Sequence, residues 1–290
     1  SDTAITDVYN CVFNNIVVEN GDASTYFCYG MFYEYKIDSV NTRKFYKMAV
    51  DLKYIEAAYR LGCHYHDYYI SNKAKKYHLI AAESNHISSI YWLGYIYRTE
   101  KDYDNMLKYF LIAAEHNDTD ALYDLGGYYQ EIGNYDDMLK YYSMGVNLKD
   151  HNAIYMLGYF YENIKDYENM SKYYLMGINV AGNYFYVMRL FDHAKNDQQL
   201  FLKIYSENDV IKKKYSKEIY QLILHYIETE NITSDLINFI LELDCSDNSH
   251  LKFIQKILKE KIDLIDLHFS YSIEGKGFKE AKQDFIERLI

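Results

Sequence analysis

Hydrophobic and polar positions between residues 20 and 180 repeat with a fixed period of 32 residues. Each period contains a glycine, and a tyrosine follows that glycine by three residues. The glycines are Gly30, Gly62, Gly94, Gly126 and Gly158, of which the last four directly follow a leucine. Self-similarity at such a period predicts structural units that stack on their neighbours. We therefore expect about five copies of one unit.

Each copy contains the pattern of two helices. Ala121, Leu125 and Tyr129 recur at i, i+4 and i+8, which places them in one stripe of a helix. A similar stripe for the second helix comprises Met106, Tyr109, Phe110, Ala113 and Ala114. Between the stripes, segments such as "EKDYDN" and "IKDYEN" supply Asp and Asn side chains that cap a helix N-terminus. The pattern predicts an all-α chain of helix-turn-helix units.

Small residues recur beside an aromatic pair in every copy. After the pairs come Ala49, Ala81, Ala113, Gly145 and Gly177. A small residue at a helix crossing lets a neighbouring ring enter the gap. We therefore expect the repeat glycines to lie at equivalent helix crossings, with the rings of one unit filling gaps in the adjoining unit. One helix pair cannot bury its stripe alone and needs the next copy against it.

The repeat signature ends near residue 180, which predicts two regions. Residues 1–180 form the repeat solenoid, and residues 181–290 contain degenerate helical repeats and C-terminal capping helices. The second region keeps helical stripes, for example Leu236, Phe239, Ile240 and Leu243. After "SIEGKG" at 272–277 we expect a last amphipathic helix.

Composition excludes several classes of partner and location. The chain has a net charge of −11, which disfavours binding to nucleic acid and to anionic lipid surfaces. Its four cysteines lie far apart in sequence, as in a protein of a reducing compartment. No apolar stretch is long enough to cross a membrane, and the N-terminal residues lack a signal-peptide layout. We expect a soluble cytoplasmic protein.

Residue types that carry chemistry do not gather in any catalytic pattern. Cys63, His64 and His66 are close in sequence, but no other copy supplies a complementary ligand for a metal. No glycine-rich phosphate-binding motif follows a predicted strand. We expect no enzyme activity, no metal and no cofactor.

The repeat itself resembles a known family. The pattern A-x-x-x-L-G-x-x-Y in "ALYDLGGYY" and "AIYMLGYFY", with "YFLIAA" after it, resembles the Sel1-like repeat, a relative of the tetratricopeptide repeat. The tyrosine-rich "LGYFYENIKDYENMSKYYLMGI" is similar to Sel1-like repeat proteins of giant viruses of amoebae. Two features differ from the family pattern: the short 32-residue period, and residues such as Asn117 in place of a glycine after the second helix. The resemblance implies a right-handed α-solenoid that acts as a protein-binding scaffold, in a viral case within the host cytoplasm.

Tyrosines recur on the face of the first helices opposite the buried stripe. In stacked helix pairs the first helices line the concave side, where a peptide binds. The predicted binding residues are Tyr59, Tyr91, Tyr95, Arg98, Tyr123, Gln130, Glu131, Tyr155 and Tyr159. Tyrosine offers a large contact area and a hydroxyl at low entropic cost. The alternative is that these rings only fill the space between adjacent first helices.

Lysines also recur every 32 residues, at Lys44, Lys76, Lys108, Lys140 and Lys172. They could form a basic stripe for an acidic partner. We favour a solvated helix face, on which each lysine covers apolar surface and pairs with a carboxylate one turn away.

Three functions fit this pattern. The first is an adaptor whose groove binds a segment of a host or viral protein. The second is an RNA-binding helical-repeat protein, which the net charge of −8 over residues 1–180 disfavours, with 16 Lys and Arg against 24 Asp and Glu. The third is a structural subunit of a larger complex.

Overall fold

The computed structural model describes residues 21–67, 71–181, 184–229 and 233–243, together with residues 252, 255, 256, 258 and 259. Every regular element in these ranges is an α-helix, which confirms the predicted all-α class. Backbone contacts divide the chain into two units, Ser1–Ala153 and Ile154–Ile290. The boundary predicted at residue 180 stays a prediction. The helix predicted after residue 277 lies outside the described residues.

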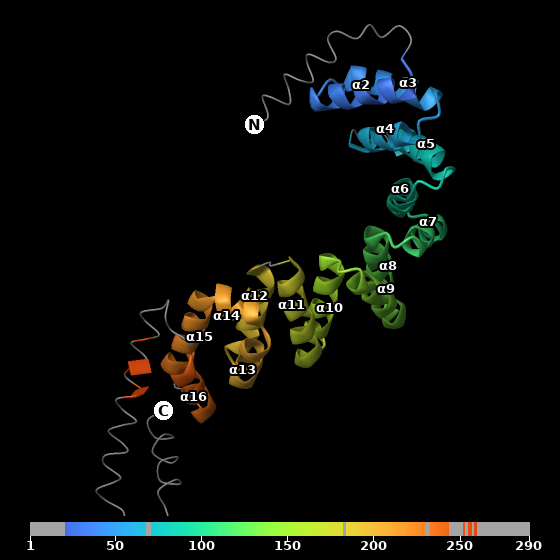
Figure 1. Ribbon diagram of the computed structural model, residues 1–290. Helices are drawn as coiled ribbons and strands as arrows, with labels where there is room; N and C mark the ends of the chain where they lie inside the picture. The colour runs from blue at the N-terminus through green and yellow to red at the C-terminus, as the bar shows by residue number, and fades with distance from the viewer. Residues whose placement is uncertain are drawn as a thin grey trace, which may run out of the picture. The chain divides into compact units, whose positions relative to one another are not determined.

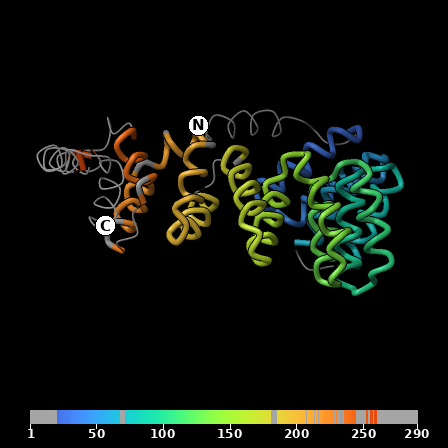
Figure 2. Tube along the Cα trace, turned by 90° about the horizontal axis from the view of Figure 1, so that it is seen from below, coloured from blue at the N-terminus to red at the C-terminus, as the bar shows by residue number. Residues whose placement is uncertain are grey.

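The first unit is a series of helix pairs (Figure 1). They are α2 (Ala23–Tyr35) with α3 (Ser39–Asp51), α4 (Ile55–Asp67) with α5 (Ser71–Ala82), α6 (Ile87–Thr99) with α7 (Tyr103–Glu115), and α8 (Thr119–Glu131) with α9 (Tyr135–Asn147). Each helix packs mainly against the one before and the one after it in the chain. Figure 2 shows the green helices of this unit side by side. The even-numbered helices α2 to α12 are called first helices below, and their odd-numbered partners second helices.

The second unit begins within α10 (His151–Asn163). The helices that follow are α11 (Tyr167–Ala181), α12 (Tyr184–Ala194), α13 (Gln198–Glu207), α14 (Asp209–Lys214), α15 (Ser216–Glu228) and α16 (Ser234–Glu242). Leu190, Leu222, Leu236 and Ile240 are buried in a common core of this unit. The stripe that contains Leu236 and Ile240 predicted this for the last two. The Leu-Gly signature is lost after α10, but the burial of one helix face continues.

Each repeat glycine lies where an aromatic ring of the second helix crosses the first helix. A Cβ built on Gly126 would lie 2.5 Å from Cε1 of Tyr142, and one built on Gly62 would lie 2.6 Å from Cε1 of His78. The other three repeat glycines have the same relationship with Tyr46, Phe110 and Tyr174. The glycines therefore stand at equivalent crossings, as predicted. However, the ring comes from the same helix pair, so the prediction that it enters from the adjoining unit was wrong for these residues.

The small residues of the second helices make the contact between successive copies. A Cβ built on Gly145 would lie 2.7 Å from Cβ of Ala153, and one built on Gly177 would lie 2.6 Å from Cζ of Tyr186. Ala49, Ala81 and Ala113 hold the same place and are fully buried. Close approach of two backbones at a small residue thus joins one pair to the next. Gly145 contacts Ala153, eight residues later, whereas Gly177 contacts Tyr186, nine residues later. Relative to the 32-residue period, the register of α12 is therefore shifted by one residue.

Helices of the repeat end in a residue with left-handed backbone, at intervals of 16 residues where the structure describes them. These residues are Ile37, Lys53, Asn85, Lys101, Asn117, Gly133, Lys149 and Lys165. The amide of the next residue then donates to a carbonyl five residues back, as from Asp118 N to Ala113 O at 3.2 Å. This is the Schellman arrangement, in which glycine is favoured and asparagine is tolerated. Asn117, with a φ of 60°, therefore performs the role of the glycine that the family pattern has there.

Helix N-termini carry the predicted caps. The side chains of Asp102, Asn134 and Asp166 accept hydrogen bonds from the backbone amides three residues later, at 3.2, 3.2 and 3.1 Å. These bonds satisfy amides that have no partner within the helix. Each turn of the repeat is therefore fixed on both sides, by a left-handed residue before the cap and by the cap itself.

The recurring lysines lie over aromatic rings. In every copy the tyrosine three residues after the glycine stacks on the first ring of the aromatic pair, as Tyr129 does on Tyr141 with centroids 5.4 Å apart. The Nζ of Lys140 lies 4.8 Å from the Tyr141 ring centroid, and the other four lysines lie over their rings in the same way. Such contacts contribute about 0.5–1 kcal/mol each at exposed sites. The lysines therefore cover apolar surface, as we expected, while their pairing with a carboxylate one turn away stays a prediction.

Candidate partner-binding face

The candidate face is the side of the first helices that points away from the buried Leu and Ala stripe. Its predicted residues are Tyr59 in α4, Tyr91, Tyr95 and Arg98 in α6, Tyr123, Gln130 and Glu131 in α8, and Tyr155 and Tyr159 in α10. Tyr123 and Glu131 are exposed, and the other seven are half-buried. The first unit contains seven of these residues, and the second unit contains Tyr155 and Tyr159.

Three of the predicted residues converge on Asp124. Arg98 Nη1 donates to Asp124 Oδ1 at 2.7 Å, and Tyr91 Oη donates to Asp124 Oδ2 at 3.1 Å. The other arm of Arg98 donates to Glu131 Oε1 at 3.2 Å. These contacts join α6 to α8, so they connect successive helix pairs on the candidate face. Sequence reasoning missed Asp124 because its position holds Arg60 and Trp92 in the preceding copies, so periodicity gives no signal for it.

Asp124 is only 8% exposed, and burial raises the pKa of its carboxyl in spite of Arg98 and the hydroxyl of Tyr91. Removing a carboxylate from water opposes its ionisation, and one arginine that is itself partly exposed does not fully compensate. The cluster is therefore held together by geometry and hydrogen bonding more than by favourable charge burial.

Tyr91 and Tyr123 differ in how far their rings are engaged in packing between helices. Its ring stacks on Phe110 with centroids 5.7 Å apart, and burial raises the pKa of its hydroxyl. It is thus largely engaged in packing between helices. Tyr123, with 36% exposure, presents more of its ring to solvent, while it contacts Tyr142 at a centroid distance of 6.1 Å.

Aromatic rings fill the same face between α4 and α6. The ring centroids of Tyr59 and His86 lie 4.7 Å apart, and those of Tyr95 and Trp92 lie 5.4 Å apart. Trp92 also contacts His66 at 4.6 Å between ring centroids. Trp92 was absent from the predicted set, although it lies between the predicted Tyr91 and Tyr95.

The second unit contains a charge cluster centred on Glu162. Its carboxylate accepts hydrogen bonds from Tyr174 Oη at 2.6 Å and from His193 Nε2 at 2.9 Å, and Arg189 Nη2 lies 2.9 Å away. Burial opposes ionisation, but these hydrogen bonds and the arginine outweigh it and lower the pKa of Glu162. Tyr159 lies beneath Arg189 at 6.0 Å and stacks on Tyr155, also at 6.0 Å.

The two clusters have the same register with the charges exchanged. Glu162 stands where Arg98 stands two copies earlier. With the one-residue shift in the register of α12, Arg189 occupies the position that Asp124 has two copies earlier. Each unit therefore has a charged contact between successive first helices, with acid and base in opposite order.

The predicted absence of a metal site concerned Cys63, His64 and His66. His64 Nε2 lies 2.9 Å from Ser39 Oγ, His66 packs on Trp92, and burial raises the pKa of Cys63 to about 11. Their contacts are thus with separate neighbours, and the thiol stays protonated at neutral pH. Within the described ranges, no three His, Cys, Asp or Glu side chains gather as around a metal ion.

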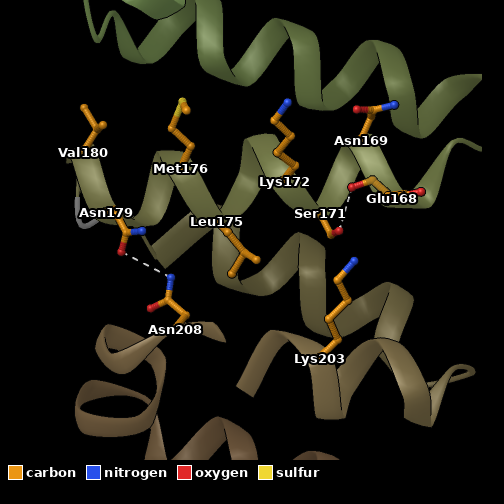
Figure 3. A pocket seen from close by; sticks show the side chains of 10 residues that line it. All are labelled: Glu168, Asn169, Ser171, Lys172, Leu175, Met176, Asn179, Val180, Lys203 and Asn208. Atoms are coloured by element: carbon orange, nitrogen blue, oxygen red, sulfur yellow. Dashed lines mark hydrogen bonds between the residues drawn. The ribbon is translucent and has the colours of Figure 1, made fainter. Parts of the chain in front are cut away.

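A pocket of about 580 Å³ opens in the second unit between α11 and α13 (Figure 3). Its polar lining is largely occupied by internal contacts. Ser171 Oγ donates to the carbonyl of Glu168 at 2.8 Å, and Asn208 donates to Asn179 at 3.2 Å while it caps α14. Lys172 and Lys203 contribute the positive charge of the lining. The pocket lies on the side of the second helices and includes none of the predicted residues.

Comparisons with known proteins agree with the helix pairs. A profile of the tetratricopeptide repeat matches residues 87–115 and 151–184, and each match begins at the start of a first helix. No curated protein matches the chain. No helix in the described part combines the length and apolar character of a membrane span.

Solved structures similar to this chain include two of MamA. One has a TM-score of 0.45 and 20% identity and covers 56% of this chain and 93% of that one; the other has 0.44 and 21%, and covers 52% and 93%. The chain is also similar to c5321, a protective antigen of uropathogenic Escherichia coli described as displaying an SLR fold. Here the TM-score is 0.41 at 14% identity, over 94% of this chain and 69% of that one. By the family profile, two stretches of the chain match the tetratricopeptide repeat: residues 87–115, which span α6 and α7, and residues 151–184, which include α10 and α11.

Proposed function

We propose that the chain is a non-enzymatic scaffold that binds a segment of another protein along its first helices. The observation that carries the proposal is the exposure of Tyr123 and Glu131 on α8, where Glu131 accepts a hydrogen bond from Arg98 of α6. Aromatic and arginine side chains contribute most of the binding energy in protein interfaces. A rigid tyrosine needs little ordering on binding, so it is well suited to anchor a peptide.

We give different roles to five of the nine predicted residues. Tyr91 and Arg98 are held by Asp124, so they fix the spacing of α6 and α8 and present a pre-ordered surface. Tyr123, Gln130 and Glu131 are the residues that contact the partner. Pre-ordering lowers the entropic cost of association.

The partner is a neutral or basic segment of a host or viral protein in the cytoplasm. The net charge of −11 and the exposed carboxylate of Glu131 favour such a segment over an acidic one. The same charge argues against RNA, whose phosphates this surface repels.

Affinity purification with quantitative mass spectrometry tests the proposal, with the wild type and Tyr123→Ala as baits. Tyr135→Ala is the matched control, because Tyr135 is 53% exposed but belongs to a second helix, α9. We expect Tyr123→Ala to lose a partner that Tyr135→Ala retains. Equal recovery on both variants would contradict the proposed face, and salt-dependent retention of RNA by the wild type would favour the RNA-binding alternative.

A further inference from the structure

One junction of the first unit has three polar side chains where the other copies have different residues. At the crossing beside Gly62, His78 stands where the other four copies have Tyr or Phe. In the stripe of α6, Ser89 stands where three other copies have alanine, and His86 precedes α6 where three have aspartate. The three side chains meet where α5 packs against α6, which is the contact between the second helix pair (α4 and α5) and the third (α6 and α7).

Hydrogen bonds connect these side chains in one direction. His86 Nδ1 lies 3.2 Å from the backbone amide of Ser89 and must accept from it, so the ring proton is on Nε2, 3.2 Å from Glu56 Oε2. Ser89 Oγ lies 3.2 Å from the same Nδ1 and 3.4 Å from His78 Nδ1. The hydroxyl therefore donates to His86 and accepts from His78. Both histidines are neutral in this arrangement.

The second ring nitrogen of His78 is enclosed. The residue is fully buried, and its ring stacks on Trp92 with 10° between the planes and 6.0 Å between the centroids. Its Nε2 atom is buried and has no hydrogen-bond partner within the described structure. A proton added to Nε2 would be a donor without an acceptor, and its charge would be removed from water.

The titratable groups around His78 do not compensate a positive charge. Helix α4 contributes His66 and the neutral hydroxyl of Tyr59, and the residue before α6 is His86, whose own partner is Glu56. Burial, together with His66 and His86, lowers the pKa of His78 from the ordinary 6.5 to about 3. At mildly acid pH a solvated His78 therefore binds a proton that the packed ring does not bind.

Protonation of His86 acts on the same junction. A proton on Nδ1 occupies the lone pair that accepts from the Ser89 amide, so α6 loses its N-terminal cap. The charged ring gains attraction to Glu56, but this pair is partly exposed and such pairs contribute little. An aspartate keeps an acceptor oxygen in either protonation state. Aspartate caps the first helices of three other copies, at Asp22, Asp118 and Asp150.

We propose that the junction of the second and third helix pairs is a pH-sensitive joint, which opens when His78 and His86 take up protons. Opening moves the His78 ring away from Gly62 and Trp92 and into solvent, while the fourth pair, α8 and α9, stays closed. This inference goes beyond the proposed function and does not depend on it.

The direction of the pH dependence follows from the lowered pKa of His78. The closed joint is fully stable above the ordinary histidine value and loses stability as pH falls below it. Because the opened ring binds its proton with ordinary affinity, the ratio of open to closed joint should rise about 30-fold between about pH 7.5 and about pH 5.

Fluorescence tests the joint, because Trp92 is the only tryptophan of the chain and stacks on His78. The emission maximum of the full chain is measured in dilute solution at about pH 7.5 and about pH 5. The variants are His78→Phe and His78→Tyr, which give the ring of the other copies, and His86→Asp, which gives their cap. His116→Asn is the matched control, because His116 is an exposed histidine that follows α7. Circular dichroism at about pH 7.5 confirms that each variant is folded.

We expect the wild-type emission to shift to longer wavelength on acidification. The shift should be absent from His78→Phe and His78→Tyr, smaller in His86→Asp and unchanged in His116→Asn. Hydrogen–deuterium exchange, corrected for the intrinsic effect of pH, should show protection falling about 10-fold or more in α4 to α6 and less than about 2-fold in α8 and α9.

Three results would overturn the inference. The first is a wild type whose emission does not shift, and the second is a shift of the same size in both His78 variants. The third is an equal loss of protection throughout the first unit, since the joint would then not open separately from its neighbours.

Discussion

The ring of Tyr142 fills the space beside Gly126 in which a side chain would begin, so that a Cβ built there would lie 2.5 Å from the ring. The next residue, Gly127, has open space at the same point of its own backbone apart from the Tyr142 hydroxyl. Two adjacent glycines in one helix therefore have different surroundings. One is required by packing between helices, and the other leaves part of the candidate face without a side chain.

This contrast predicts opposite effects of the same substitution. Gly126→Ala should lower the free energy of unfolding by about 1–3 kcal/mol, because the fully buried ring must move. Gly127→Ala should raise it by about 0.5–1 kcal/mol, because alanine is the better helix former and meets no clash. Urea unfolding followed by circular dichroism measures both. Similar effects from the two variants would contradict the assigned packing.

Three buried tyrosines in equivalent places predict a second contrast. Tyr174→Phe and Tyr46→Phe each remove a hydrogen bond to a carboxylate, so each should destabilise the fold by about 1.5–3 kcal/mol. Tyr142→Phe removes a hydroxyl that has no partner within the described structure, so it should be neutral or stabilise by up to about 1 kcal/mol. The same unfolding measurement ranks the three. A loss at Tyr142 as large as at Tyr174 would show that its hydroxyl is paired.

Left-handed helix ends occupied by residues other than glycine predict sites of easy stabilisation. Ile37 has a φ of 58° and a β-branched side chain that is 84% exposed. Ile37→Gly should raise the unfolding free energy by about 1 kcal/mol, since the steric cost of this conformation is removed. Ile132→Gly is the control, because Ile132 is also exposed but has a φ of −88°. There glycine should lower stability by roughly 0.5–1 kcal/mol.

The two charge clusters predict opposite dependences of stability on pH. The pKa of Asp124 is raised, so the folded state binds more protons than the unfolded state between the ordinary and the raised value. Stability relative to Asp124→Asn should therefore fall as pH rises through that window. The pKa of Glu162 is lowered, so stability relative to Glu162→Gln should be fully present above the ordinary glutamate value and lost as pH falls through the lowered one.

Unfolding of the wild type and both variants across pH about 3–7 measures these differences. The control is the pH dependence of Tyr135→Ala, which carries the same charges as the wild type. Differences of the same sign for Asp124→Asn and Glu162→Gln would contradict the account of their surroundings.

The sequence predicts the architecture well because its packing residues recur. Gly126 and Leu125 mark a helix crossing, and Asp102 and Asn134 mark helix starts, and the structure confirms each of these. The period alone could not decide whether the ring beside Gly126 belongs to the same pair or to the next, since both arrangements repeat every 32 residues. Only coordinates separate a contact 16 residues away from one between copies.

The candidate site is harder to predict because its specific contacts do not recur. Asp124 pairs with Arg98 in one copy, whereas the preceding copy has His66 against Trp92 at the same two positions. Tyrosines at Tyr59, Tyr91 and Tyr123 were visible as a ladder, but their different burial depends on neighbours that vary between copies. Residues that distinguish one copy from another are therefore found by structure, and residues that all copies share are found by sequence.

Hydrogen–deuterium exchange of the full chain, with and without a saturating amount of the partner recovered by affinity purification, tests the proposed binding face most directly. The bound partner should slow exchange in the first helices α6 and α8, around Tyr123 and Glu131, and leave the second helices α7 and α9 unchanged. Protection centred on α7 and α9, or on the pocket between α11 and α13, would contradict the assignment of the first helices as the binding face.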